Sequence, residues 1–205
     1  GFVPGGGSRK ARATWQPGNL VEVGWRARLA EQLGNYAGEL REPHAARALD
    51  DAAQLAGLSA ACAVLDTALP EREPHPAMFE GFSALLGALG HPGWPVIYVR
   101  LELGLLQELG FGLDLTKCAA TGAIEDLGYV SPKTGRAVSR AAAEPYKEKL
   151  IELPAFLSAG GLPADAEELR KGLDLTGYFL ERHVFWPHNK PLPAARARFM
   201  ETLQR

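Results

Sequence analysis

The sequence predicts an α+β fold, in which a short region of strands is followed by a larger group of helices. Apolar and polar residues alternate from Leu20 to Trp25, which is the side-chain period of a strand. From about Ala45, apolar residues recur at intervals of three and four, which is the period of a helix. A third feature lies inside the helical part, where residues 113–142 have the spacing of a small zinc ribbon.

Length and composition are those of a globular chain with one large or two small domains. The chain has 205 residues, of which 46% are hydrophobic, and this is enough for a proper core. The formal net charge of −2 and the pI of about 6.2 do not mark the whole chain as a nucleic-acid binder. Two cysteines are too few for a disulfide framework.

The sequence contains no signal for a membrane. No apolar run reaches the length of a membrane span. The first residues also lack the basic region that precedes the apolar region of a signal peptide. We therefore expect a cytoplasmic protein without a membrane partner.

The strand region lies near the start of the chain. The first predicted strand covers residues 20–29 and follows a turn at Pro17-Gly18-Asn19. Gly34-Asn35 can turn the chain into a second strand at about residues 36–40. Two strands alone cannot bury a core, so we expect further strands to complete the sheet.

Five helices are predicted after the strands. The first two end at prolines or glycines, which do not continue a helix. The third is apolar on most of its circumference, which is typical of a helix at the centre of a bundle. The predicted helices cover about residues 45–69, 75–89, 94–109, 164–184 and 193–203.

Basic residues gather near the start of the chain, where Glu22 is the one acidic residue among the first thirty. Such a local excess indicates a surface for an anionic partner, and the simpler alternative is a solvated basic surface. The run Gly5-Gly6-Gly7 lacks the Gly-Lys-Ser/Thr ending of a nucleotide-binding loop. We expect a flexible loop whose cations contact a nucleic-acid backbone.

Two tryptophans accompany these cations. Aromatic rings among cations can stack on the bases of a single strand, and the alternative for both rings is a place in the core. Trp25 occupies an alternating apolar position, so we expect it in the core. For Trp15, the sequence favours neither stacking on bases nor a place in the core. The predicted DNA-binding set is Arg9, Lys10, Arg12, Trp15, Arg26 and Arg28.

The ribbon-like segment has lost most of its metal ligands. Two C-x2-C knuckles would place four ligands at positions 118, 121, 139 and 142. Cys118 is the one cysteine among them, and the others are Thr121, Ser139 and Ala142. An alcohol or a methyl group cannot replace a thiolate on zinc. We expect the hairpin to be retained without metal, and we predict no other cofactor.

We expect no enzymatic activity. Cys118 would need a base and an orienting partner to act as a nucleophile, and the five histidines are scattered without a local signature. No pair of carboxylates is placed for acid–base chemistry.

Arg100 is unusual because it lies within the most apolar predicted helix. Its neighbours on one helical face are Gly104 and Gln107. Since Gly104 has no side chain, a groove can open beside the guanidinium and bind a peptide that ends in a carboxylate after apolar residues. The alternative is an ion pair inside the molecule, with Glu102, Glu108 or another helix.

Several short segments, in this order along the chain, resemble the RecO family of DNA repair and recombination mediators. Each segment alone is a weak signal, but the ordered set spans nearly the whole chain. The segments are Gly7-Ser8-Arg9, residues 16–21, 100–112 and 118–122, Tyr129-Val130-Ser131-Pro132, Gly135-Arg136 and residues 175–184.

The resemblance implies an architecture and a set of partners. It implies an OB-type barrel at residues 1–44, from which the first strands are missing, and a helical domain at 45–205 with the ribbon-like insertion at 113–142. It implies binding to single- and double-stranded DNA, strand annealing, and work with RecR and with the acidic C-terminal tail of single-stranded DNA-binding protein, so that RecA loads onto coated strands. The alternative is a helical adaptor that binds only proteins.

Overall fold

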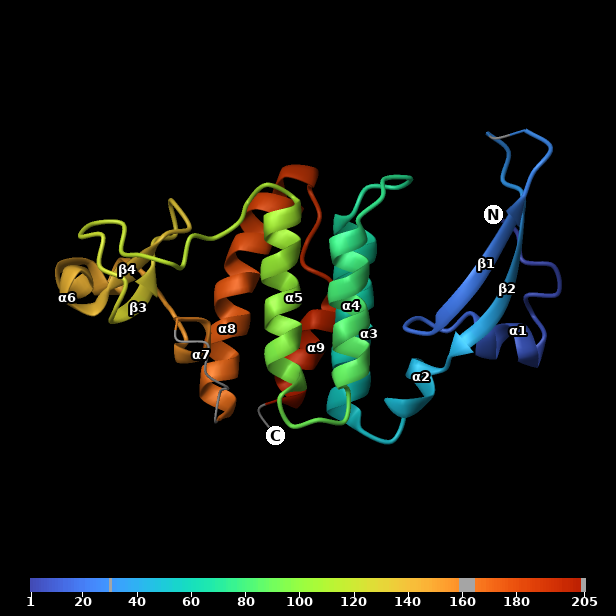
Figure 1. Cartoon of the computed structure of the whole chain (residues 1–205), viewed down its shortest axis with the longest axis horizontal. Coiled ribbons are helices and arrows are strands. Elements are labelled where there is room, and N and C mark those ends of the chain that lie inside the picture. The colour runs from blue at the N-terminus through green and yellow to red at the C-terminus, as the bar shows by residue number, and fades with distance from the viewer. Residues whose placement is uncertain (30, 159–164, 204–205) are drawn as a thin grey trace.

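The computed structural model describes residues 1–29, 31–158 and 165–203. These residues form an elongated molecule with an N-terminal pair of strands at one end, a helical bundle in the middle and a small sheet at the other end (Figure 1). The structure is therefore mixed α/β, as the sequence predicts. No helix in the described ranges is long and apolar enough to span a membrane.

The N-terminal part consists of one short helix and a two-stranded antiparallel ribbon. Helix α1 (Arg9–Thr14) precedes strands β1 (Leu20–Arg26) and β2 (Asn35–Glu42). The prediction of a flexible loop that carries the first cations is wrong, because those cations lie on α1. The helix forms because the Ser8 side chain accepts a hydrogen bond from the Ala11 backbone nitrogen at 3.2 Å, which caps a run of good helix formers.

One face of the ribbon is apolar and largely open to solvent. Side chains alternate along a strand, so Val21, Val23 and Trp25 share a face with the residues they oppose on β2, which include Tyr36 and Leu40. Trp25 is 43% exposed, so among the described residues it does not lie in a core, in contrast to the prediction. Among the described residues, the sheet consists of these two strands, with one isolated bridge between residues 2 and 35 beside it. No further strand of the described residues covers the apolar face.

The helical bundle begins with two helices where the sequence predicts one. Helix α2 (His44–Arg47) is short, and α3 (Ala52–Ala68) follows it. The break falls at Asp51, whose carboxylate accepts hydrogen bonds from the backbone nitrogens of Ala53 and Gln54 and so starts a new helix. Helices α4 (Pro76–Ala88) and α5 (Trp94–Glu108) lie close to their predicted positions.

The bundle is completed by segments from the second half of the chain. Helix α8 (Ala166–Phe179) begins at its cap Asp165 and continues as a π-helical segment η2 (Leu180–Phe185) and a 3-10 turn η3 (Trp186–His188). Ala164, which the sequence places at the start of this helix, lies outside the described residues. Helix α9 (Ala194–Thr202) packs along α3.

Helix α5 is central, with α4 on one side and α8 on the other (Figure 1). Its buried residues lie around most of its circumference, as its composition predicts. Tyr98 of α5 packs on Phe199 of α9, with 4.6 Å between the ring centroids. This contact joins the middle of the chain to its last helix.

The segment predicted as a hairpin forms a three-stranded antiparallel sheet. Strands β3 (Leu127–Val130) and β4 (Ala137–Ser139) pair, with Tyr129 opposite Val138. A third strand, β5 (Ile151–Glu152), joins the other edge of β3 and was not predicted, because two residues are too short for a pattern. Short helical segments α6 (Arg140–Ala143), η1 (Glu144–Lys149) and α7 (Ala155–Ser158) surround the sheet.

Candidate nucleic-acid and partner interfaces

Helix α1 presents its cations to solvent. Arg9, Lys10 and Arg12 are all exposed on six residues of helix. Trp15 follows directly, is half-buried, and meets Tyr36 of β2 edge to face at 6.4 Å. The sequence therefore places four members of the predicted DNA-binding set on one short segment.

A shallow hollow of about 320 Å³ lies beside these residues. Its lining includes Lys10, Trp15 and Tyr36, together with Gly38 of β2. Gly38 matters here because a side chain at this position would collide with the Trp15 ring. A cation next to two aromatic rings is a suitable place for a base and its phosphate.

The remaining two members lie apart from α1. Arg26 is the last residue of β1 and opposes Asn35 at the hairpin end of the ribbon, and Arg28 lies in the hairpin loop. Trp15 packs at Gly38, three residues further along β2. Arg26 and Arg28 are exposed, but they form a separate basic spot at the hairpin end.

Carboxylates occupy the rest of the ribbon. Arg41 forms salt bridges with Glu22 and Glu39, and Glu42 lies 3.3 Å from His44. The Arg41 charge is thus neutralised by its neighbours. Among the described residues of the N-terminal part, the unpaired basic surface therefore lies on α1 and at the hairpin end. The overall charge of the chain does not reveal so local an excess.

Arg100 is exposed on α5 and forms no salt bridge with any residue that the structure describes. Both glutamates named as alternative partners are engaged elsewhere. Glu102 pairs with Arg196, and Glu108 lies 2.9 Å from His75.

The other two residues of the predicted peptide site differ in position. Gln107 is exposed like Arg100, whereas Gly104 is half-buried against α4. A side chain at Gly104 would come within 3.2 Å of the terminal methyl of Met78. The absent side chain of Gly104 therefore accommodates Met78 instead of opening a groove, and this expectation is wrong in detail. What remains is an exposed cation on a mainly apolar helix.

The four ribbon positions are brought together around Cys118. The Ser139 backbone nitrogen and hydroxyl donate to the Cys118 sulfur at 3.3 and 3.5 Å. Burial raises the pKa of the thiol, but hydrogen bonds from Ser139 and Thr121 outweigh burial and lower the pKa to about 6. Ala142 packs at the edge of the same apolar cluster. Among the described residues, no three His, Cys, Asp or Glu side chains are grouped to hold a metal.

Sequence reasoning missed a buried polar network in the bundle. Arg196 of α9 donates to both carboxylate oxygens of Glu102, at 2.7 and 2.9 Å, and to the Leu173 carbonyl at 2.6 Å. The Thr176 hydroxyl donates to the same carboxylate. Burial disfavours the guanidinium charge, but the Glu102 carboxylate outweighs burial and raises the pKa of Arg196. The signal was present as a glutamate inside an apolar helix.

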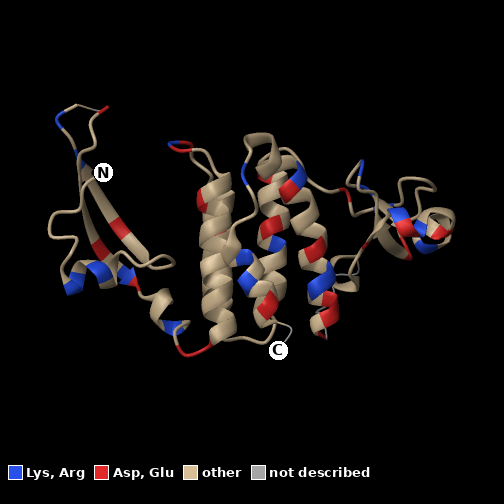
Figure 2. Ribbon diagram, turned by 180° about the vertical axis from the view of Figure 1, so that it is seen from behind, with Lys and Arg blue, Asp and Glu red and all other residues tan. Residues whose placement is uncertain are grey.

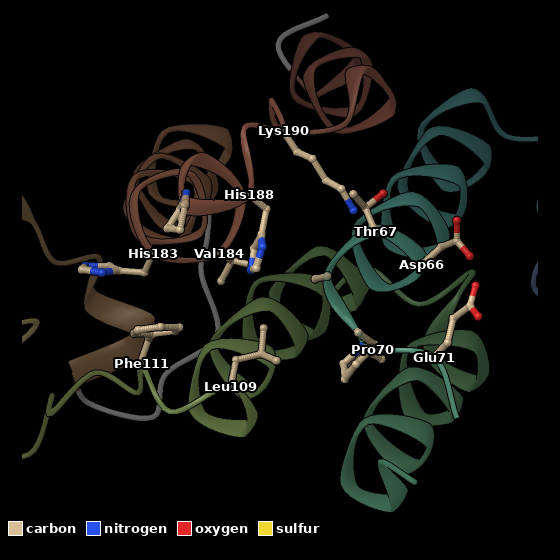
Figure 3. A pocket seen from close by; sticks show the side chains of 13 residues that line it. Asp66, Thr67, Pro70, Glu71, Leu109, Phe111, His183, Val184, His188 and Lys190 are labelled. Carbon is tan, nitrogen blue, oxygen red and sulfur yellow. The ribbon is translucent and has the colours of Figure 1, made fainter. Parts of the chain in front are cut away.

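A second missed feature is a cavity of about 720 Å³ at one end of the bundle. The ends of α3 and α5 and the segment η2–η3 line it (Figure 3). Its apolar wall includes Leu109 and Val184, and its polar side chains include His188 and Lys190. The His183 ring stacks on Phe111 at 5.2 Å. No residue spacing in the sequence marks this cavity, because three distant segments form it.

The chain is similar to proteins of one known family. Residues 49–192 match the family described as "Recombination protein O C terminal". "DNA repair protein RecO" of Phenylobacterium zucineum is 55% identical over 204 residues, which are 98% of this chain and 83% of the relative. The protein of the same name from Rhodospirillum centenum is 54% identical over 206 residues, which are 98% and 81% of the two chains. The one from Cereibacter sphaeroides is 52% identical over 206 residues, which are 100% and 85%.

The strand pair, helical bundle and small sheet thus define a mixed α/β protein with a RecO C-terminal domain. The chain belongs to the RecO family.

Proposed function

We propose that the chain acts in DNA repair as a recombination mediator. In this role it binds single- and double-stranded DNA, anneals complementary strands, and helps RecA to load onto strands coated by single-stranded DNA-binding protein. The observation that carries the proposal is helix α1, which exposes Arg9, Lys10 and Arg12 beside Trp15. The relatives, each named a DNA repair protein, support the same role.

The geometry of α1 suits contact with a nucleic-acid backbone and not the reading of sequence. Exposed cations on a short helix can neutralise phosphates and release counterions whatever the bases are. Trp15 and Tyr36 then offer aromatic surface for stacking. Arg26 and Arg28 extend the contact at the far end of the ribbon. No catalytic step is required, since the protein changes only which partner occupies the strand.

We further propose that β1 and β2 belong to an OB-type barrel. The support is the apolar face with Val23, Trp25 and Leu40, of which Val23 is 47% exposed and Leu40 is 36% exposed. A barrel would bury such a face against its other strands. In this arrangement, residues 1–44 form the barrel part and residues 45–205 the helical domain, with the ribbon-like insertion at 113–142. The insertion holds its shape through Cys118 and Ser139 and needs no zinc.

The partner proposals rest on charge. Arg100 is exposed and has no salt-bridge partner among the described residues, and Gln107 lies on the same helix. Such a cation suits the carboxylate of the acidic C-terminal tail of single-stranded DNA-binding protein. RecR is proposed as the partner that acts together with the DNA-binding surface. The protein is expected to act in the cytoplasm, at the nucleoid.

Reversing the charges on α1 tests DNA binding. The variant Arg9→Glu/Lys10→Glu/Arg12→Glu should bind DNA of any sequence more weakly at moderate salt. The slope of log affinity against log salt is negative, and each lost phosphate contact should reduce its magnitude by about 0.7 to 0.9. A matched control is Lys133→Glu/Lys147→Glu/Lys149→Glu, which reverses three exposed lysines of the small-sheet region.

A second candidate function is that of an adaptor that binds only proteins. Glu22, Glu39 and Glu42 of the ribbon favour it, because carboxylates repel phosphate. Unchanged DNA binding in the α1 variant, or equal loss in the lysine control, would contradict the assignment to α1. An absence of salt-dependent DNA binding in the unmodified chain would favour the adaptor.

A further inference from the structure

Helices α3 and α4 carry almost no charge. From Asp51 to Ala88, the chain has five carboxylates and one arginine, and the helices themselves contain only Asp66 and Glu80. Figure 2 shows these helices almost entirely tan, whereas α8 carries several blue and red turns. A helix at the surface of a bundle normally carries charged side chains on its outer face. On α3 and α4, Asp66 and Glu80 are the two charged side chains, and both are exposed.

An open groove lies on this face. Its volume is about 670 Å³, and its lining is mainly apolar. The N-terminal unit closes one side, because Pro17 precedes β1 and contributes to the wall. The groove is lined by Ser59, Cys62, Ala63, Leu65 and Asp66 of α3, by Phe82 of α4 and by Pro17.

Exposed apolar side chains extend the groove in both helices. Leu55 lies one turn before Ser59 on the same stripe of α3 and is 39% exposed. Phe79 lies one turn before Phe82 on α4 and is 62% exposed. Contiguous exposed apolar side chains of this kind mark interaction sites in proteins of this size.

The charged residues of α3, α4 and the loop between them are mainly acidic. Asp66 lines the groove and is exposed. Glu80 is exposed on α4, and Glu71 and Glu73 are exposed in the loop that joins the two helices. Arg72 is the one cation in this part of the described chain. Burial raises the pKa of the Cys62 thiol to about 11, and the Asp66 carboxylate adds to this rise. A basic side chain of a ligand can pair with Asp66 because this carboxylate is exposed.

These charges exclude two ligands already considered. A phosphate backbone would be repelled by the carboxylates, and an acidic tail of the kind proposed for Arg100 would be repelled as well. The remaining ligand is a protein segment with an apolar side and basic flanks. A groove with small residues of α3 on one side and phenylalanines of α4 on the other is suitable for an amphipathic helix.

We propose that the groove between α3 and α4 binds an amphipathic, basic helical segment of a partner protein. The partner places apolar side chains between Phe79, Phe82 and the Ser59–Ala63 stripe, and its lysines or arginines pair with Asp66 and Glu80. This site goes beyond the proposed DNA-binding and tail-binding surfaces, and its ligand has the opposite charge to both of theirs.

A pair of labelled peptides tests the proposal on the full chain. The first is a helix of about 15 residues with leucines on one side and lysines on the other, a length at which a helix is marginally stable alone. The second has glutamates in place of the lysines. Fluorescence anisotropy should show saturable binding of the lysine peptide and much weaker binding of the glutamate peptide.

Two variants locate the binding. Phe79→Asp should weaken the lysine peptide at least about tenfold, because it removes an apolar anchor. Tyr146→Asp is the matched control, since Tyr146 is also 62% exposed but lies on η1 in the small-sheet region. Asp66→Lys/Glu80→Lys should weaken the lysine peptide and strengthen the glutamate peptide. Melting curves of each variant confirm that the fold is kept.

Three outcomes would overturn the proposal. The first is no saturable binding of the lysine peptide, or equal binding of the two peptides. The second is unchanged binding by Phe79→Asp, or an equal loss in Tyr146→Asp. The third is a dimer in sedimentation that Phe79→Asp dissociates, because the groove would then be covered by a second copy of this chain.

Discussion

Two ion pairs of this chain join the same chemical groups in opposite environments. Arg41 and Glu22 meet on the exposed ribbon, where their side chains are 47% and 65% exposed. Arg196 and Glu102 meet inside the bundle, where only 4% and 3% of each side chain is exposed. The exposed pair is screened by water and salt, whereas removal of one buried partner leaves a charge without solvent. The bundle thus depends on specific polar contacts, and the ribbon can vary its charges.

The largest expected effect is at Arg196. Arg196→Ala should lower the free energy of unfolding by about 3 to 5 kcal/mol, because it leaves the Glu102 carboxylate buried and unpaired. Chemical denaturation followed by circular dichroism measures this. The double variant Glu102→Leu/Arg196→Met should lose much less, since no charge remains to be desolvated. A double variant as unstable as Arg196→Ala would show that the loss of stability comes from altered packing and not from an unpaired charge.

Arg100 should separate binding from stability. Arg100→Ala should weaken binding of an acidic peptide that ends in an apolar residue by roughly 1.5 to 3 kcal/mol, the range for hydrogen bonds to charged groups. Its melting temperature should barely change, because the guanidinium is exposed. The matched control is Arg198→Ala, which removes another exposed arginine, on α9. A destabilised Arg100 variant that still binds the peptide would contradict the assignment.

The smallest effect is expected on the ribbon. Arg41→Ala should leave the free energy of unfolding nearly unchanged, because the pair it breaks is exposed and screened by water. The same denaturation measurement applies, at low and at moderate salt. A loss comparable with that of Arg196→Ala would mean that the Arg41 pair is buried in the protein in solution.

The sequence predicts the helices better than the N-terminal part. Apolar periodicity located α3, α4, α5, α8 and α9, since their packing follows from their own residues. It missed the break between α2 and α3, because the cap at Asp51 starts a new helix although the apolar pattern continues. It also misplaced Trp25, because alternation shows that a face is apolar but not whether anything covers it.

The candidate sites divide in the same way. The cations of α1 are adjacent in sequence, so their grouping was visible without a structure. Arg26 and Arg28 seemed to belong with them, but the length of β1 holds them apart. The groove on α3 and α4 and the partner of Glu102 depend on contacts between distant segments, for which a single sequence has no local signal.

The pairing of Glu102 with Arg196 also affects the order of assembly during synthesis. The two residues are separated by 94 positions, so all of the intervening residues must be synthesised before they can meet. Until α9 emerges, α5 has a carboxylate with no counter-ion and an apolar wall with no Phe199. A nascent chain interrupted before α9 therefore cannot close its central helix into a stable core, and it exposes apolar surface that chaperones and proteases recognise.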